Sequence, residues 1–312
     1  MDFDIIIIGG GPAGISAGIY AARKKMKTLL IAKAIGGSSM VSATVENWLG
    51  IVTISGWELA QSFEKHLRAQ EGIRIVTDEI VKSIESAEGV YSVTIGNGSR
   101  YEAGTVIIAT GVRHRHLGVP GETEFDGKGV AYCSTCDAPF FKGKRVAVIG
   151  GGNCGLEAVE DLLPYATEIV LITDVAELTG DAVLQERILS SGKVSVIYST
   201  RMREIFGSKR VEGLRYEEKE TGEIREITVD GVFVEIGMVP NSELATGIVE
   251  RNSRGEIITN ARNMETSCPG IFAAGDVTDM PYRQNGISAG QGAVAALSAY
   301  DYMKRKRETI SE

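Results

Sequence analysis

The feature that most constrains this chain is a strand, glycine turn and helix pattern that occurs twice. The apolar run Ile5 to Ile8 leads into Gly9-Gly10-Gly11-Pro12-Ala13-Gly14, and Arg145 to Ile149 leads into Gly150-Gly151-Gly152-Asn153-Cys154-Gly155. Each glycine run is followed by a helical stretch and then by a second apolar strand. One such motif is weak evidence of a nucleotide site, whereas two in the same context are strong evidence. The repeat predicts two doubly wound α/β domains.

A turn-linked β segment and a closing strand also recur in each half. The pairs Asn97-Gly98 and Thr221-Gly222 are typical turn residues, and each lies between two strand-like runs. Each half then ends on an apolar strand that stops at a glycine, Val106 to Gly111 and Val232 to Gly237. A length of 312 residues is enough for about two domains with separate cores. We therefore expect two Rossmann-like, three-layer domains.

The three glycines of each turn have different roles at a dinucleotide site. The first allows the turn, the second lets the backbone approach a pyrophosphate, and the third lets the helix pack on the strand. The helix N-terminus then directs its positive end at the phosphates. The first site is expected at Gly9, Gly11, Pro12, Ala13 and Gly14, and the second at Gly150, Gly152, Asn153 and Gly155.

The residue about 20 positions after each glycine turn usually contacts the ribose. That residue is Ala32 in the first unit, where the usual acid is missing, and Asp174 in the second. An aspartate favours a free 2′-hydroxyl and repels a 2′-phosphate, and no Lys or Arg occurs between Arg145 and Arg187. The sequence therefore favours NADH over NADPH, unless an arginine arrives from the Arg201–Arg203 stretch. The alternative is that Asp174 is a solvated residue at the start of a loop.

The run Cys133-Ser134-Thr135-Cys136-Asp137 lies between the two glycine turns. A zinc site would need two more ligands at matched spacing, which Cys154, Cys268 and the three histidines do not offer. Two-residue spacing instead lets the thiols close into a reversible disulfide, with the thiolate as the attacking species. Asp137 is the nearby group to move a proton, or else a helix N-cap. We expect Cys154 and Cys268 in the core.

Charge and hydropathy narrow the class of protein. The net charge of −8 disfavours nucleic acid as a partner, because phosphate contacts need a basic face. The run Lys304 to Arg307 is expected at the cationic end of a C-terminal helix. No apolar run reaches the ~20 residues that span a bilayer, and no secretory signal precedes Asp4. We therefore expect a cytoplasmic protein with no membrane partner, in which a close cysteine pair is catalytic.

These residues resemble the low-molecular-weight thioredoxin reductases and the flavoprotein part of alkyl hydroperoxide reductases. The most specific likeness is the Cys-Ser-Thr-Cys-Asp run just before the second glycine turn. The other shared segments are Val45 to Trp48 with Gly50, Ala109-Thr110-Gly111, Phe272 to Asp276, Tyr282-Arg283-Gln284 and Ser288-Ala289-Gly290. The likeness covers essentially the whole chain. It implies a discontinuous FAD-binding domain, residues 1–114 and 244–312, and a nicotinamide-binding domain with the dithiol, residues 115–243.

The resemblance also implies roles for individual residues. Cys136 would exchange electrons with the flavin, Cys133 would attack the partner's disulfide, and Asp137 would be the acid/base. The implied FAD contacts are Gly9, Gly11, Pro12, Ala13, Gly14, Gly36, Gly37, Asn47, Ala109, Thr110, Gly111, Gly275, Asp276, Arg283, Gln284 and Ala289. The family further implies a homodimer.

The activity that the resemblance implies is a thioredoxin-disulfide reductase. Electrons would pass from a reduced donor through FAD and the Cys133–Cys136 disulfide to a thioredoxin- or glutaredoxin-like protein; a close variant serves a peroxiredoxin system. NADPH-using members carry a His-Arg-Arg run and a later Arg, where this chain has Thr173-Asp174-Val175 and Thr179. NADH is therefore favoured, and reduced deazaflavin or ferredoxin is the alternative donor. A small-molecule dithiol oxidase is a further alternative, against which the intact second glycine turn counts.

Overall fold

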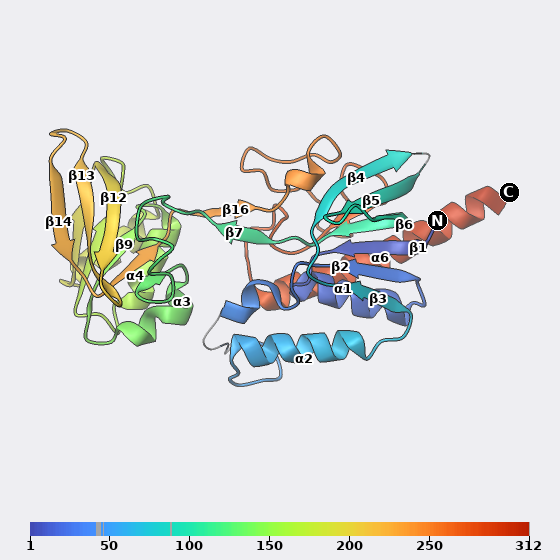
Figure 1. Ribbon diagram of the computed structural model, residues 1–312, viewed down its shortest axis with the longest axis horizontal. Coiled ribbons are helices and arrows are strands. Elements are labelled where there is room, and N and C mark those ends of the chain that lie inside the picture. The colour runs from blue at the N-terminus through green and yellow to red at the C-terminus, as the bar shows by residue number, and fades with distance from the viewer. Residues whose placement is uncertain (42–44, 46, 88, 312) are drawn as a thin grey trace. The chain divides into compact units, whose positions relative to one another are not determined.

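The repeated strands and glycine turns form the frames of two units. In the computed structural model, which describes residues 1–41, 45, 47–87 and 89–311 without the side chains of Val41, Cys136 and residues 309–311, unit 1 consists of Met1–Arg113 and Val239–Glu312. Unit 2 consists of His114–Met238. Figure 1 shows both along the chain, with unit 2 inserted into unit 1.

The return to unit 1 comes earlier in the chain than residue 244, where we expected it. Asn241 Nδ2 donates to the carbonyl of Thr110 at 2.9 Å, and Arg113 pairs with Glu243 at 2.6 Å. These bonds attach residues 241–243 to unit 1. Where the chain passes between the units, β7 (Val112–His114) and β16 (Met238–Pro240) pair in a two-stranded sheet.

Unit 1 is built on a sheet in the order β3-β2-β1-β6-β5-β4, with β17 also paired to β6. Strands β3, β2, β1, β6 and β17 run parallel, and β5 and β4 follow antiparallel. The bounds are β1 Phe3–Ile8, β2 Thr28–Ile31, β3 Ile73–Val76, β4 Val81–Ala87, β5 Val90–Ile95, β6 Arg100–Ile108 and β17 Ile271–Ala273. The Asn97-Gly98 turn joins β5 to β6, which confirms that prediction.

Successive residues of β1 enter two different cores, because side chains alternate between the faces of a strand. Ile5 and Ile7 pack in one core with residues of α1 (Pro12–Arg23), α2 (Gly56–Arg68) and α6 (Asn285–Ser311). Ile6 and Ile8 pack in the other core with residues of β4 and β5. Burial on both faces explains why β1 is apolar throughout. Figure 1 shows α1 and α2 on the same side of this sheet.

Unit 2 has a fully parallel sheet in the order β11-β10-β9-β15-β8. Its strands are β8 Val130–Ala131, β9 Arg145–Ile149, β10 Glu168–Ile172, β11 Val194–Ile197 and β15 Gly231–Val234. The helices are α3 Ser134–Asp137, α4 Asn153–Leu162 and α5 Ala182–Ser190, and an antiparallel sheet is formed by β12 Thr200–Gly207, β13 Val211–Glu218 and β14 Ile224–Thr228. The Thr221-Gly222 turn joins β13 to β14, as predicted.

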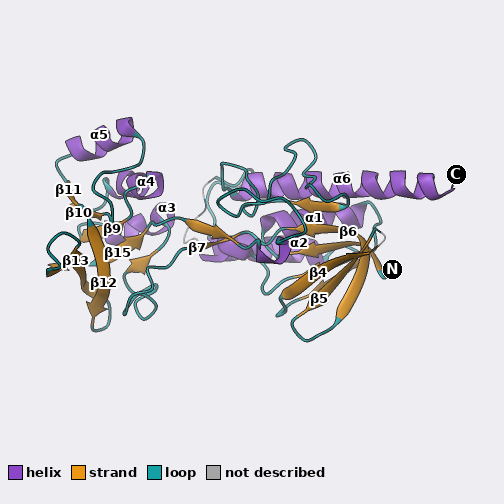
Figure 2. Ribbon diagram, turned by 90° about the horizontal axis from the view of Figure 1, so that it is seen from above, coloured by secondary structure: helices purple, strands orange, loops and turns teal. Residues whose placement is uncertain are grey.

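The parallel sheet of unit 2 lies between helices and the antiparallel sheet. Val146 and Val148 of β9 pack in one core with residues of α4 and α5, whereas Ala147 and Ile149 pack with residues of β12 and β13. Figure 2 shows the helices on one side of this sheet and β12 and β13 on the other. The expected fold class, two Rossmann-like α/β units of three layers, is confirmed.

Three short 3-10 helices complete the described elements, at Gly37–Val41, Ala138–Phe141 and Glu243–Ala245. The basic run Lys304 to Arg307 lies in the C-terminal helix α6, as expected. Within the described ranges, no helix is both long enough and apolar enough to cross a membrane. The same part of the chain contains no group of His, Cys, Asp or Glu side chains suited to a metal ion.

Candidate redox and nucleotide sites

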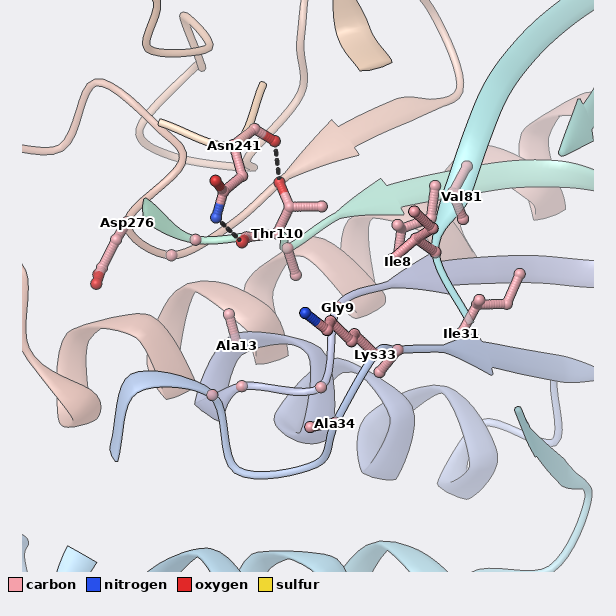
Figure 3. Close-up of a pocket in the computed structure, with 18 of the residues that line it drawn as sticks. Ile8, Gly9, Ala13, Ile31, Lys33, Ala34, Val81, Thr110, Asn241 and Asp276 are labelled. Atoms are coloured by element: carbon pink, nitrogen blue, oxygen red, sulfur yellow. Dashed lines mark hydrogen bonds between the residues drawn. The ribbon is translucent and has the colours of Figure 1, made fainter. Parts of the chain in front are cut away.

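A cavity of about 1030 Å³ opens at the carboxyl end of β1 in unit 1. Many of the predicted FAD contacts line it: Gly9, Gly11, Pro12, Ala13, Gly37, Ala109, Thr110, Gly111, Gly275 and Asp276. Figure 3 shows Gly9, Ala13, Thr110 and Asp276 around this space. The other predicted contacts, Gly14, Gly36, Asn47, Arg283, Gln284 and Ala289, are outside its lining.

The glycine turn of unit 1 shows which glycines the chain itself requires. Gly9 has φ +124°, and a Cβ on Gly14 would lie 1.9 Å from the carbonyl oxygen of Gly9. Gly11 is different, because its φ of −81° suits any residue and a Cβ there would meet its nearest neighbour, Gly37 Cα, at an ordinary 3.7 Å. Packing within the chain therefore does not explain Gly11. The close approach of a pyrophosphate does, so the turn fits FAD.

Unit 2 repeats this geometry around a second cavity of about 790 Å³. Gly150 has φ +134°, and a Cβ on Gly155 would lie 1.8 Å from the carbonyl oxygen of Gly150. A Cβ on Gly152 would meet only Thr179 Oγ1, at 3.7 Å. Of the predicted contacts, Gly150, Gly152, Asn153 and Asp174 line the cavity and Gly155 does not. The second turn therefore fits a second pyrophosphate by the same test.

Polar side chains on the unit 1 cavity are held in place by their neighbours. Thr110 Oγ1 donates to the carbonyl of Asn241 at 2.7 Å, and the amide of Asn241 returns a bond to the carbonyl of Thr110 (Figure 3). Ser288 Oγ donates to Asp276 Oδ1 at 2.9 Å. Burial raises the pKa of Asp276 above its ordinary value, although Ser288 and Arg283 act in the opposite direction. Sequence reasoning missed Asn241, which is distant in the chain from every motif of unit 1.

Residues that the resemblance placed near the flavin also contact each other in unit 1. Asn47 Nδ2 donates to Gln284 Oε1 at 3.0 Å. Arg283 pairs with the buried carboxylate of Glu256 at 2.6 Å, while its Nε is buried without a hydrogen-bond partner in the described chain. Ala289 lies on α6. The structure thus brings Asn47 and Gln284 together, as expected of residues at one site.

Cys133 lies at the N-cap of α3 and is disulfide-bonded. The side chain of its predicted partner, Cys136, lies outside the described residues. Cys154 and Cys268 are not in disulfides. Cys268 is partly buried, but the expectation of a core position for Cys154 was wrong, since this residue is exposed in the first turn of α4.

Helix α3 is anchored on two sides by carboxylates. Ser134 Oγ and Thr135 Oγ1 donate to the same oxygen of Asp161, at 2.8 and 3.0 Å, and Asp161 belongs to α4. The backbone of Ser134 bonds to the carboxyl of Glu235, which follows β15 and also lines the unit 2 cavity. Burial raises the pKa of Glu235 to about 8. The segment between the two cysteines is therefore fixed to the frame of unit 2.

Asp137 is half-buried at the end of α3. Burial raises the pKa of its carboxyl to about 6, and the nearby carboxylate of Asp126 adds to the rise. Its side chain makes no cap hydrogen bond to the 3-10 helix that follows, so the N-cap alternative is not supported. A carboxyl that titrates near neutral pH, four positions from Cys133, suits proton transfer.

The strand before Cys133 is fixed by a buried acid that sequence reasoning did not identify. Glu122 is 2% exposed and accepts hydrogen bonds from the backbone of Leu117 and Gly118 at 2.9 and 2.8 Å. It also accepts one from the hydroxyl of Tyr132 at 3.0 Å. Because Tyr132 directly precedes Cys133, Glu122 restrains the chain on the N-terminal side of the disulfide.

The rim of the unit 2 cavity contains cations that the local sequence did not reveal. Asp174 lines this cavity, and Lys219 Nζ lies 3.6 Å from its carboxylate and also donates to its backbone carbonyl. Arg201 lines the same cavity, whereas Arg203 pairs with Glu217. The expectation that nothing basic lies near this ribose site was therefore wrong. The cations come from β12 and the end of β13, outside the stretch that was searched.

Comparison with known proteins places this site in a family. A family model described as pyridine nucleotide-disulphide oxidoreductase matches residues 3–296. An alkyl hydroperoxide reductase component from Pseudomonas putida (its F protein) is 44% identical over 305 residues, which cover 97% of this chain and 58% of that protein. NADH dehydrogenase of Bacillus subtilis strain 168 is 44% identical over 303 residues, which cover 97% and 59%. The chain thus spans less than two thirds of the length of these curated relatives.

A solved structure supports the same placement. Thioredoxin reductase from Streptococcus pyogenes MGAS5005 matches with a TM-score of 0.81 at 36% identity, covering 97% of this chain and 98% of that one. The resemblance inferred from the glycine turns and the cysteine run is confirmed. The chain belongs to the family of FAD-binding pyridine nucleotide-disulphide oxidoreductases, with a fold like that of thioredoxin reductases.

Proposed function

We propose that this chain is an FAD-dependent disulfide reductase that passes electrons from a reduced donor, NADH in preference to NADPH, to a thioredoxin- or glutaredoxin-like protein. The observation that carries the proposal is the disulfide at Cys133, four positions from a carboxyl with a pKa of about 6, in a unit with its own nucleotide cavity. Two anchoring carboxylates, Asp161 and Glu235, give this dithiol segment a fixed position.

The residues of unit 1 would hold FAD, which supplies a relay for two electrons between the donor and the disulfide. Gly9, Gly11 and Gly14 would admit its pyrophosphate, with the N-terminus of α1 directed at the phosphates. Asp276 and Asn47 belong to the polar groups that we assign to the rest of the molecule. Gly150, Gly152 and Gly155 would admit the pyrophosphate of the nicotinamide in unit 2.

The exchange at the cysteines balances without a further reactant. Two electrons and two protons convert the Cys133–Cys136 disulfide into two thiols. The Cys133 thiolate then attacks one sulfur of the partner's disulfide, and the other partner sulfur departs as a thiol after taking a proton. Cys136 displaces the partner's remaining sulfur and restores the disulfide. Asp137 would move the proton that each step releases or consumes.

The test is NADH-driven reduction of a thioredoxin disulfide by the FAD-loaded protein. Cys133→Ser and Cys136→Ser should each abolish turnover, because neither can complete the exchange. Cys268→Ser is the matched control, since it removes a thiol from unit 1 that is in no disulfide, and it should turn over like the parent. If both site variants kept protein-disulfide turnover, the dithiol would be structural and the proposal wrong.

The electron donor has a test of its own. Asp174 at the ribose rim supports NADH, and one relative at 44% identity is named an NADH dehydrogenase. NADH, NADPH, reduced deazaflavin and reduced ferredoxin should be compared for anaerobic bleaching of the flavin. Bleaching by the last two alone would make the second glycine turn a retained scaffold. The predicted homodimer is part of the proposal, and light scattering would show whether it forms.

A further inference from the structure

Three charged side chains meet at the ribose end of the unit 2 cavity: Asp174, Lys219 and Arg201. The Lys219 ammonium is 3.6 Å from the Asp174 carboxylate, and the two side chains are 37% and 78% exposed. Arg201 is exposed, and no carboxylate in the described part of the chain pairs with it. The rim therefore holds two cations, one of which is neutralised by Asp174.

The sheet register explains why Lys219 and Arg201 reach the same cavity. Arg201 of β12 lies opposite Glu217 of β13, and the backbone of Lys219 donates to the carbonyl of Ser199 at 2.8 Å. Lys219 is thus two residues beyond the partner of Arg201. Residues in this diagonal relation on antiparallel strands lie on one face, about 7–8 Å apart. That spacing lets both cations contact one phosphate group.

We propose that Lys219 and Arg201 form a latent binding site for a 2′-phosphate, which Asp174 closes by pairing with Lys219. The inference rests on the proposed use of a nicotinamide donor and names the residues that set its ribose selectivity. With Asp174 present, a 2′-phosphate meets a carboxylate and a lysine that is already paired. Without it, both cations are available, and lysine and arginine are the usual ligands of phosphate.

The test compares the binding of NADP⁺ and NAD⁺ to the FAD-loaded protein by calorimetry, which needs no turnover. Asp174→Ser should raise the NADP⁺ to NAD⁺ affinity ratio by about 10-fold at low salt, the size of one screened charge contact. Adding Lys219→Gln should remove most of that gain. Lys209→Gln in the same background is the matched control. It removes the same charge from the turn after β12, where Lys209 is exposed and away from the cavity lining, and should keep the gain.

Two results would overturn the inference alone. One is an affinity ratio that does not rise in Asp174→Ser. The other is an equal loss from Lys219→Gln and Lys209→Gln, which would indicate a diffuse field and no defined site. Failure of the parent and all variants to bind either nucleotide would instead overturn both the inference and the nicotinamide part of the proposed function.

Discussion

The two units build the same glycine turn and differ in what surrounds it. The first glycine has φ +124° in unit 1 and +134° in unit 2, and the third is blocked by a carbonyl at 1.9 and 1.8 Å. In both, a Cβ on the second glycine would meet its nearest atom at 3.7 Å. The turn is therefore set by backbone geometry. The choice of ligand depends on side chains beyond it.

Those side chains differ most where the second strand of each unit ends. In unit 1 the strand leads to Ala32 and Lys33, and acids reach the cavity only from the loop after β3, at Asp78 and Glu79. In unit 2 the strand leads to Asp174, which is paired with Lys219. Unit 2 also contains the disulfide of Cys133. The comparison teaches that one frame can be assigned to holding a cofactor and its copy to delivering and receiving electrons.

The largest effect that we expect comes from Asp137, which has no equivalent in the cavity of unit 1. With Asp137 as the acid, kcat for protein-disulfide reduction should fall as the pH rises through about 6, where its carboxyl loses its proton. Asp137→Asn keeps the shape but not the proton, so kcat should drop by roughly 100-fold and this inflection should disappear. A pH profile of both proteins decides the matter. An unchanged inflection in the variant would assign the proton to another group.

A pair of alanine substitutions would separate the two turns. Gly11→Ala and Gly152→Ala should both fold, since φ and the nearest contacts at these positions suit alanine. Each added methyl group should weaken the nucleotide of its own unit by about 10- to 100-fold, the cost of overpacking a close contact. Gly11→Ala should bind FAD poorly, and Gly152→Ala should be yellow but bleach slowly with NADH.

Flavin content and anaerobic bleaching rates measure these two outcomes, and circular dichroism checks the folding. The comparison between the units would fail if Gly152→Ala lost FAD, or if Gly11→Ala retained FAD at the parent's affinity. In either case the second glycine would not be the contact point of the ligand in its own unit.

The smallest effect concerns Glu235, the buried acid beneath α3. Its folded pKa of about 8 exceeds the ordinary value of 4.5, so its contribution to stability is full at low pH and is lost as the pH rises through 8. Relative to Glu235→Gln, which does not titrate, the parent should lose at most about 1.4 kcal/mol of unfolding free energy per pH unit in this window. Urea unfolding at several pH values tests this. A constant difference between the two proteins would mean that Glu235 is ionised.

Local signals made the frame predictable, and distant contacts did not. The glycine turns and the Asn97-Gly98 turn depend on short-range geometry that neighbouring residues encode, and the structure places them as expected. Asn241 and Lys219 reach their cavities through sheet register and the return of the chain to unit 1. One sequence gives no signal for such pairs. Cys154 was misplaced because a cysteine in a turn offers the same pattern whether its side chain faces the core or solvent.

The most direct test of the central claim is to reduce the FAD-loaded protein anaerobically with NADH and count the thiols that appear. We predict bleaching of the flavin together with the pair of new thiols that one disulfide releases, and in Cys133→Ser, bleaching without that pair. Bleaching of the parent with no new thiols would contradict the account. So would a protein that cannot be loaded with FAD, or one in which NADH, NADPH, reduced deazaflavin and reduced ferredoxin all fail to release thiols.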